Sequence, residues 1–164
     1  MLKDKVLDTI LNNSLFQEKI LHHECIQASD VFIYNRGVEN IDYPLIVAKR
    51  QSSDKVTLVR KSTSLTFEVE ASPAYANLAV QVDLTHYKKI VFNGKINSTN
   101  GTAGHIFVNP TVPLYQCKTA TKYIQLSTTV QDYTIDVSDL TGEYYIGMIG
   151  SNRQITMYSL ALYI

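Results

Sequence analysis

The side chains that could carry out acid–base, nucleophilic or metal chemistry are few and widely spaced. They are His22, His23, His86, His105, Cys25 and Cys117. His22 and His23 are adjacent on an expected helix, so they point about 100° apart and cannot chelate a metal as an i,i+4 pair would. His105 and Cys117 would form a nucleophilic pair only if folding joined them, and no third group is evident to orient the imidazole. We predict inert thiols, no metal and no cofactor.

The acidic residues give no clear catalytic pair. Glu68 and Glu70 share the polar face of one expected strand, about 7 Å apart by strand geometry, whereas a glycosidase places two carboxylates across a cleft. A solvated strand face explains the pair better, and no loop collects the several oxygen ligands that calcium needs. The sequence also lacks a GxSxG nucleophile motif and a glycine-rich phosphate loop. We therefore predict no catalytic residues and a protein that is not an enzyme.

Ligand binding is the activity that the sequence favours over catalysis. The stretch 97–104 is long, polar and punctuated by glycine, and binding residues usually lie in loops on a rigid scaffold. Its amide and hydroxyl groups, with one aromatic ring and one polar tip elsewhere, are of the kind that hold sugars. The candidate ligand-binding residues are Asn97, Thr99, Asn100, Thr102, Tyr115, Asn152 and Arg153. The alternative is a plain hairpin loop whose polarity serves only solvation.

These candidates are positioned by an expected run of strands over residues 30–164. Apolar side chains alternate with polar ones in several segments, which is typical of strands with one buried and one wet face. The buried sets are Leu65, Phe67 and Val69; Leu78, Val80 and Val82; Ile90, Phe92 and Ile96; and Tyr133, Ile135 and Val137. Residues 155–164 are apolar on both faces and predict a central or covered strand. Turn signals between short strands indicate an all-β sandwich, and we expect no helix after residue 30.

Two similar corners recur in this region. Asp83-Leu84-Thr85 and Asp139-Leu140-Thr141 each precede a strand at the same offset. Aspartate and threonine can hold a tight turn through bonds to the backbone, and the leucine would plug the edge of the core. We predict two equivalent strand-to-strand corners.

Residues 1–27 have a different rhythm, which predicts a short helical segment. Its apolar side chains recur about every four residues, and they are Leu2, Val6, Leu7, Ile10, Leu11 and Leu15. Short helices are marginal in water, so this apolar face must pack on something. It either packs on the protein's own domain or acts as an assembly interface that anchors the chain to a partner or to copies of itself.

Composition limits the partners. The 15 basic and 15 acidic residues balance, which gives no basic excess for nucleic acid or a membrane surface. The charged start lacks a signal-peptide core, and no apolar run reaches the length of a membrane span. We expect a soluble protein made in a reducing cytoplasm, with both cysteines as free thiols.

Two stretches carry a resemblance to known domains. The run 82–92 (VDLTHYKKIVF) resembles a strand of jelly-roll domains, and 135–147 (IDVSDLTGEYYIG) resembles one of their corners. The opening 32–40 (FIYNRGVEN) looks like the first strand and turn of such domains. They are similar to galactose-binding-like and carbohydrate-binding-like sandwiches, which are frequent in small structural proteins of bacteriophages and prophages. The resemblance covers residues 30–164 and is a style of sequence rather than a signature motif.

The resemblance implies a jelly-roll β-sandwich and, beyond that, a virion structural protein made in the host bacterial cytoplasm. Residues 1–27 would be its anchor, and its role would be in a head fibre, capsid decoration, tail or baseplate. Its partners would be other virion proteins, further copies in a homotrimer, and a host surface glycan. Two alternatives belong to other classes, namely a stand-alone carbohydrate-binding module and an accessory domain of a hydrolase.

Overall fold

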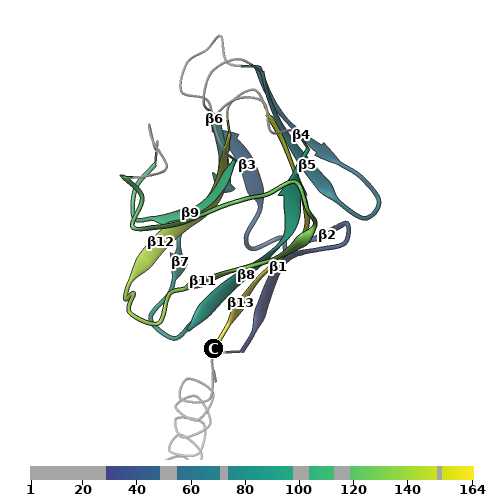
Figure 1. Ribbon diagram of the computed structural model, residues 1–164. Helices are drawn as coiled ribbons and strands as arrows, with labels where there is room; N and C mark the ends of the chain where they lie inside the picture. The colour runs from purple at the N-terminus through teal and green to yellow at the C-terminus, as the bar shows by residue number, and fades with distance from the viewer. Residues whose placement is uncertain (1–28, 49–54, 71–73, 98–103, 113–118, 151–152) are drawn as a thin grey trace, which may run out of the picture.

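A computed structural model describes residues 29–48, 55–70, 74–97, 104–112, 119–150 and 153–164, with the side chains of residues 48 and 153 excepted. The predicted helical segment, with its six assembly residues, lies outside them. Within the described residues the protein is all-β, and its strands form two sheets that pack face to face (Figure 1). No described helix is long and apolar enough to cross a bilayer.

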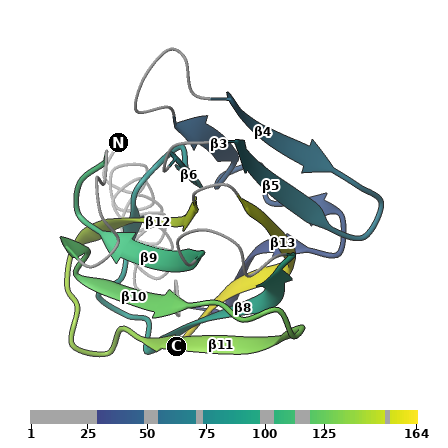
Figure 2. The same cartoon turned by 45° about the horizontal axis from the view of Figure 1, so that its top comes forward.

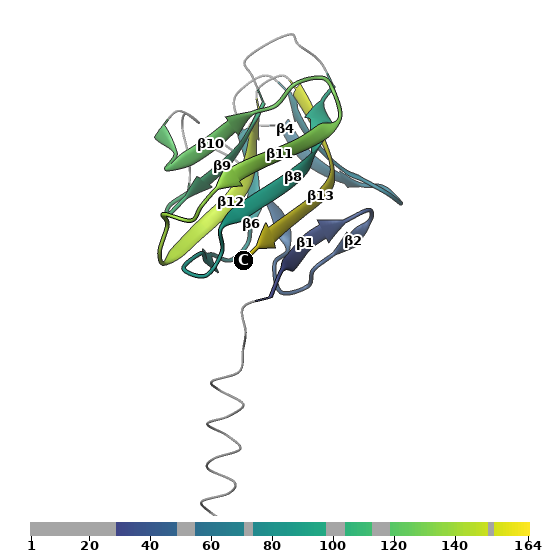
Figure 3. The same cartoon turned by 60° about the horizontal axis from the view of Figure 1, so that its bottom comes forward.

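The larger sheet has seven strands built around the longest one. They are β1 (Val31–Asn35), β2 (Val38–Glu39), β4 (Lys55–Arg60), β5 (Leu65–Glu70), β8 (Lys89–Ile96), β11 (Gln131–Asp136) and β13 (Arg153–Tyr163). One side of β13 pairs with β8 along most of its length. Its other side pairs first with β5 and then with β1, so β13 is central, as its two apolar faces predict. Figure 3 shows the order β11, β8, β13, β1 and β2 across this sheet.

The smaller sheet has six strands and supplies the second layer of the sandwich. They are β3 (Leu45–Ala48), β6 (Ala74–Leu78), β7 (Val82–Asp83), β9 (His105–Asn109), β10 (Lys122–Gln125) and β12 (Glu143–Gly150). Five of them run in the order β10, β9, β12, β6 and β3, and β7 pairs with the start of β12. All pairs are antiparallel, so each strand presents alternate residues to the core and to the outside.

The core between the sheets comes from the inward half of this alternation. Eleven of the twelve residues predicted from the sequence are buried, among them Leu65, Phe67, Ile90 and Phe92, each at 1% exposure or less. Val80 is the exception at 44% exposed, because β6 ends at Leu78 and the chain bends before β7. The prediction that Val80 continues the apolar face is therefore wrong.

The two predicted corners meet each other, but their chemistry differs. Leu84 and Leu140 are both buried, which confirms their role as plugs at the edge of the core. Asp83 Oδ1 accepts bonds from the N–H and the hydroxyl of Thr85, and these bonds hold the pKa of Asp83 below its usual range. Thr85 Oγ1 in turn accepts a bond from the N–H of Gly142 in the second corner, at 3.0 Å.

The second corner places its aspartate turn three residues earlier than predicted. Asp136 Oδ1 accepts bonds from the N–H of Ser138 at 2.9 Å and from its hydroxyl at 2.6 Å. Asp139 instead binds Lys122 Nζ at 2.8 Å, on the neighbouring strand β10. The two Asp-Leu-Thr triplets are therefore equivalent in their buried leucines and not in their hydrogen bonds.

Candidate ligand-binding face

The outer face of the smaller sheet carries two straight rows of side chains that cross its strands in register. One row reads Tyr123, Phe107, Gly147, Asn77 and Ile46 from β10 to β3. The next reads Gln125, His105, Ile149 and Tyr75 from β10 to β6. Directly paired residues lie on the same face of a sheet, about 5 Å apart, so each row is a continuous strip. Figure 2 shows β10, β9 and β12 side by side where the rows begin. We call these nine residues the aromatic rows.

The aromatic rows depart from the usual composition of an exposed sheet face. An outer face of a sandwich normally alternates to polar or charged residues, because only the inner face is buried. The nine positions include no Asp, Glu, Lys or Arg and four aromatic or imidazole rings. The outer face of the larger sheet follows the usual pattern instead, with pairs such as Lys55 with Glu70 and Asn93 with Asp132. The outer face of the smaller sheet is therefore partly covered by the chain itself, and only its open end is suited to contact a ligand.

A glycine in the middle of the first row makes room for an aromatic ring. A Cβ atom added at Gly147 would lie 2.7 Å from the tip of the Phe107 ring and would also collide with the carbonyl oxygen of Ala76. The ring therefore lies across the backbone of β12 toward Asn77, whose Cβ would be 2.9 Å away. Phe107 forms a small buried cluster there with Tyr75 and Ile149.

Asn77 lies in the same row and contains a buried polar atom without a partner. Its Nδ2 donates to the carbonyl oxygen of Leu78 at 2.6 Å, and Asn77 is only 2% exposed. Its Oδ1 has no hydrogen bond to any part of the chain that the structure describes. A buried acceptor left unpaired costs about 1–3 kcal/mol, so this amide oxygen destabilises the fold at the centre of the row.

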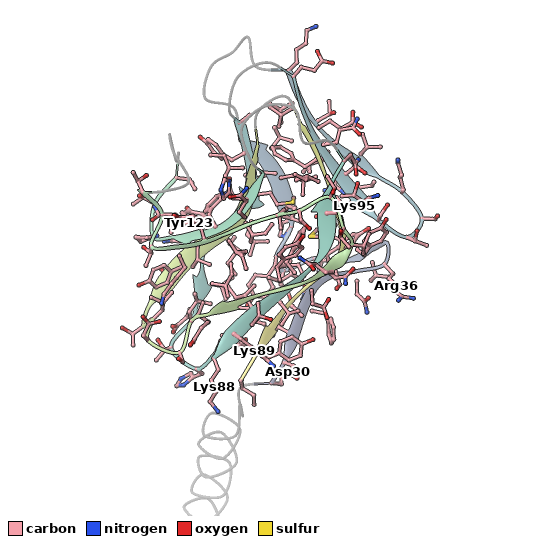
Figure 4. All side chains as sticks on the ribbon, in the orientation of Figure 1. Asp30, Arg36, Lys88, Lys89, Lys95 and Tyr123 are labelled. Atoms are coloured by element: carbon pink, nitrogen blue, oxygen red, sulfur yellow. The ribbon has the colours of Figure 1, made fainter. Side chains whose placement is uncertain are left out.

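The β10 edge is the accessible end of the aromatic rows. Tyr123 is 44% exposed, and its ring meets the imidazole of His105 edge-on with 5.7 Å between the ring centres. Gln125, directly opposite His105, is exposed. Figure 4 shows Tyr123 on the side of the molecule formed by the smaller sheet. A flat ring, an imidazole and an amide are thus presented together at one edge.

Asn109, at the end of β9, braces the connection between β9 and β10. Its Nδ2 donates to the carbonyl oxygen of Thr111 at 2.7 Å, and its Oδ1 accepts from the N–H of Thr121 at 3.1 Å. Val112 and Ala120, from the same connection, pack against the buried cluster in the aromatic rows. Asn109 therefore holds both ends of this connection beside the rows.

The loop residues predicted to bind ligand fall mostly outside the described residues. This applies to Thr99, Asn100, Thr102, Tyr115 and Asn152, whose role stays a prediction. Asn97 is described at the end of β8, where its Nδ2 lies 3.0 Å from Gln154 Oε1 and 3.2 Å from Thr156 Oγ1. Its amide is thus used within the larger sheet. The backbone of Arg153 pairs with Val69, and nothing is described of its side chain.

The paired carboxylates lie on the outer face of the larger sheet, as their alternation predicts. Glu70 forms an ion pair with Lys55 at 3.3 Å, and both side chains are more than two-thirds exposed. Glu68 Oε1 accepts a bond from Gln154 Nε2 at 3.0 Å. Both carboxylates therefore have cross-strand partners on an open surface. In the described part of the chain, no group of three His, Cys, Asp or Glu residues is placed to hold a metal ion.

The predicted binding residues lie in polar loops and on loop tips, so they do not include the aromatic rows. The signal was available in β9, where His105, Phe107 and Asn109 alternate with Ile106 and Val108. When both the odd and the even positions of a strand carry rings or apolar groups, its outer face must be covered by the chain or must bind a partner. The same reasoning applies to Tyr75 in β6, whose neighbours are alanines.

Comparison with known proteins gives a fold and no sequence family. No family model and no curated protein matches the chain. A family 29 carbohydrate-binding module from Piromyces equi matches the structure with a TM-score of 0.56 at 15% identity, over 84% of this chain and 91% of that chain. A mutant of a family 29 module, studied for its ligand recognition, gives a TM-score of 0.53 at 12% identity, over 82% and 91%.

These likenesses support the jelly-roll fold that the sequence resemblance implies for residues 30–164. The protein has the jelly-roll β-sandwich fold of carbohydrate-binding modules, as one side of the predicted resemblance implied. Nothing in them indicates a phage origin, so the virion part of that resemblance is without support.

Proposed function

We propose that this protein is a non-catalytic carbohydrate-binding module that holds a glycan chain at the accessible β10 end of the aromatic rows. The observation that carries the proposal is the accessible group of Tyr123, His105 and Gln125 at the β10 edge, in rows that contain no Asp, Glu, Lys or Arg on an outer sheet face that would ordinarily be polar. The fold shared with family 29 modules supports it, because those proteins bind carbohydrate with the same architecture.

The chemistry of the rows suits a sugar chain. A pyranose ring has an apolar C–H face that packs on a flat aromatic ring, and hydroxyl groups at its edge that need donors and acceptors. Tyr123 supplies the accessible ring, and Gln125 supplies an amide beside it. The absence of Asp, Glu, Lys and Arg in these rows favours a neutral polysaccharide over an anionic one.

The test begins with affinity electrophoresis of the full chain in gels that contain neutral polysaccharides, namely β-glucans, xylan, mannan and galactan. We expect retardation in at least one gel. Titration calorimetry with an oligosaccharide of that polymer then compares the wild type with Tyr123→Ala. Loss of one stacking ring should weaken binding by about tenfold, equivalent to about 1.4 kcal/mol.

A matched control comes from the opposite sheet. Phe32 is 50% exposed, close to the exposure of Tyr123, and lies on β1 of the larger sheet. Phe32→Ala removes a similar exposed ring and should leave the affinity unchanged within twofold. Equal losses in the two variants, or no retardation by any neutral polysaccharide, would refute the proposal.

The virion role stays a separate prediction that rests on the sequence resemblance alone. It needs residues 1–27 as an anchor and a homotrimer or a virion partner, whereas a stand-alone module needs neither. Sugar binding fits both roles, because a virion adhesin would also bind a host surface glycan. What separates them is whether assembly depends on residues 1–27.

A further inference from the structure

The outer face of the larger sheet contains an open depression of about 400 Å³. Side chains from five separate segments line it, and they are Arg36, Thr63, Asn93, Val130 and Tyr158. Figure 4 shows Arg36 and Tyr123 at opposite sides of the sandwich, so this depression is separate from the aromatic rows. A volume of this size lies at the small end of the range for ligand pockets, about 300–1,000 Å³, and suits a single sugar ring.

Two irregularities of the backbone meet at the depression. The pairing of β13 with β8 slips between Met157 and Ser159, which leaves Tyr158 as the extra residue of a bulge. Arg36 has a φ of 43°, and no other non-glycine residue in the described segments has a positive φ. Bulges and strained residues concentrate at functional sites, because both aim a side chain where a regular strand would not.

The lining groups are chemically complementary to a sugar acid. Among the described residues, the Arg36 guanidinium has no ion pair, and Arg36 is exposed. Asn93 Nδ2 donates to Asp132 Oδ1 at 2.7 Å, which leaves Asn93 Oδ1 free to accept from a ligand hydroxyl. Val130, at 45% exposed, and the half-buried ring of Tyr158 provide apolar surface.

The Arg36 guanidinium, which forms no ion pair with the described residues, favours a negatively charged ligand. Arginine offers two parallel N–H groups that match a carboxylate, and such bidentate pairs are stronger than neutral hydrogen bonds. We propose that the depression is a second binding site, which takes one uronic acid unit of an acidic polysaccharide. The Arg36 fork would hold the carboxylate, while Tyr158 and Val130 pack on the ring. This site goes beyond the proposed function, since it lies on the other sheet and prefers a charged sugar.

The test uses the full chain, labelled with ¹⁵N, and oligomers of galacturonate and of mannuronate. We expect the amide signals of Arg36, Asn93 and Tyr158 to shift in a saturable way with at least one of these oligomers. The methyl ester of the same oligomer removes the charge and keeps the ring, so it should bind at least tenfold more weakly. Shifts confined to residues of the aromatic rows, equal affinity for acid and ester, or no shift with either oligomer would overturn the proposal.

Two variants that each remove one positive charge distinguish binding at the depression from non-specific electrostatic attraction of the anionic oligomer. Arg36→Gly removes the guanidinium at a backbone position that glycine accepts readily, and it should weaken uronate binding about tenfold or more. Lys88→Gln removes one exposed positive charge elsewhere on the surface (Figure 4), and it should change the affinity less than twofold. Equal losses in both variants would refute the site. The wild-type shifts and the ester comparison require no variant to fold. Failure of neutral glycans to bind the aromatic rows would leave this result intact.

Discussion

The backbone N–H of Arg36 donates a hydrogen bond of 2.8 Å to the carbonyl oxygen of Tyr158. This bond joins the turn between β1 and β2 to the bulge of β13, two places where the chain leaves regular geometry. It holds Arg36 in the left-handed region, which costs a non-glycine residue about 1–2 kcal/mol. The structure thus retains backbone strain beside the depression in the larger sheet.

Arg36→Gly is expected to stabilise the fold while it weakens the proposed uronate site. Relief of the left-handed strain outweighs the extra flexibility of glycine in the unfolded chain, for a net gain of about 0.5–1 kcal/mol in the free energy of unfolding. Urea denaturation measures this gain. A decrease in stability would show that the Arg36 side chain contributes contacts that exceed the cost of its backbone.

Gly147→Ala is expected to destabilise the protein by about 2–3 kcal/mol. The added methyl would collide with the Phe107 ring and with the carbonyl oxygen of Ala76, which belongs to the paired backbone of β6. Thermal and urea unfolding measure the loss. Gly142→Ala is the matched control, because its φ of 88° is strained for alanine but no atom lies within 4 Å of the new methyl. Its cost should be about 1 kcal/mol, from strain alone. Equal losses would mean that both the Phe107 ring and the backbone at Ala76 move aside without penalty.

Glu39→Gln is expected to remove a contribution to stability that depends on pH. Burial raises the pKa of the Glu39 carboxyl, but bonds from Arg60 and from the N–H of Leu45, together with the Arg60 charge, outweigh it and leave the pKa below its ordinary value. A carboxyl with a lowered folded pKa stabilises the fold fully above its unfolded pKa, near 4.3, and loses this contribution as the pH falls through the folded pKa.

The measurement is the difference in unfolding free energy between wild type and Glu39→Gln, taken from about pH 7 down to about pH 3. It should be on the order of 1 kcal/mol at neutral pH, because the Arg60 side chain is 52% exposed and the pair is screened by water. It should shrink below about pH 4. A difference that stays constant over the whole range would show that the carboxylate charge contributes nothing.

A chain of residues 29–164 is expected to keep the melting temperature of the full protein. The described core is built from residues between Ile33 and Leu162, and the side chain of Asp30 accepts the N–H of Ile164 where the chain enters β1. Calorimetry compares the two chains, and light scattering compares their masses. A lower melting temperature would indicate that residues 1–28 pack on the sandwich. A larger assembly for the full chain alone would support the assembly interface predicted for Leu2, Val6 and Leu7.

The sequence predicted the sandwich because alternation is a local property. Each set of inward residues, such as Ile90 with Phe92, indicates a buried face within a few residues of chain. Its burial can therefore be predicted without knowing the partner strand. The predictions were wrong where a strand ended or where a residue from another strand supplied an unexpected partner. Val80 follows the end of β6, and Asp139 has a lysine on a neighbouring strand within reach, which replaced its expected turn.

The face that we propose for glycan binding was decided only by tertiary structure. Tyr123, Phe107 and Asn77 share a row because β10, β9, β12 and β6 pair in one register, and the sequence does not state which strands become neighbours. A shift of one residue in any pairing would turn these side chains to the other face. The same holds for Arg36 and Tyr158, which are joined through a bulge that no local pattern marks. Periodicity along the chain thus determined that the strands have apolar faces that pack into a sandwich. Long-range strand pairing determined which side chains, distant in sequence, a ligand would contact together.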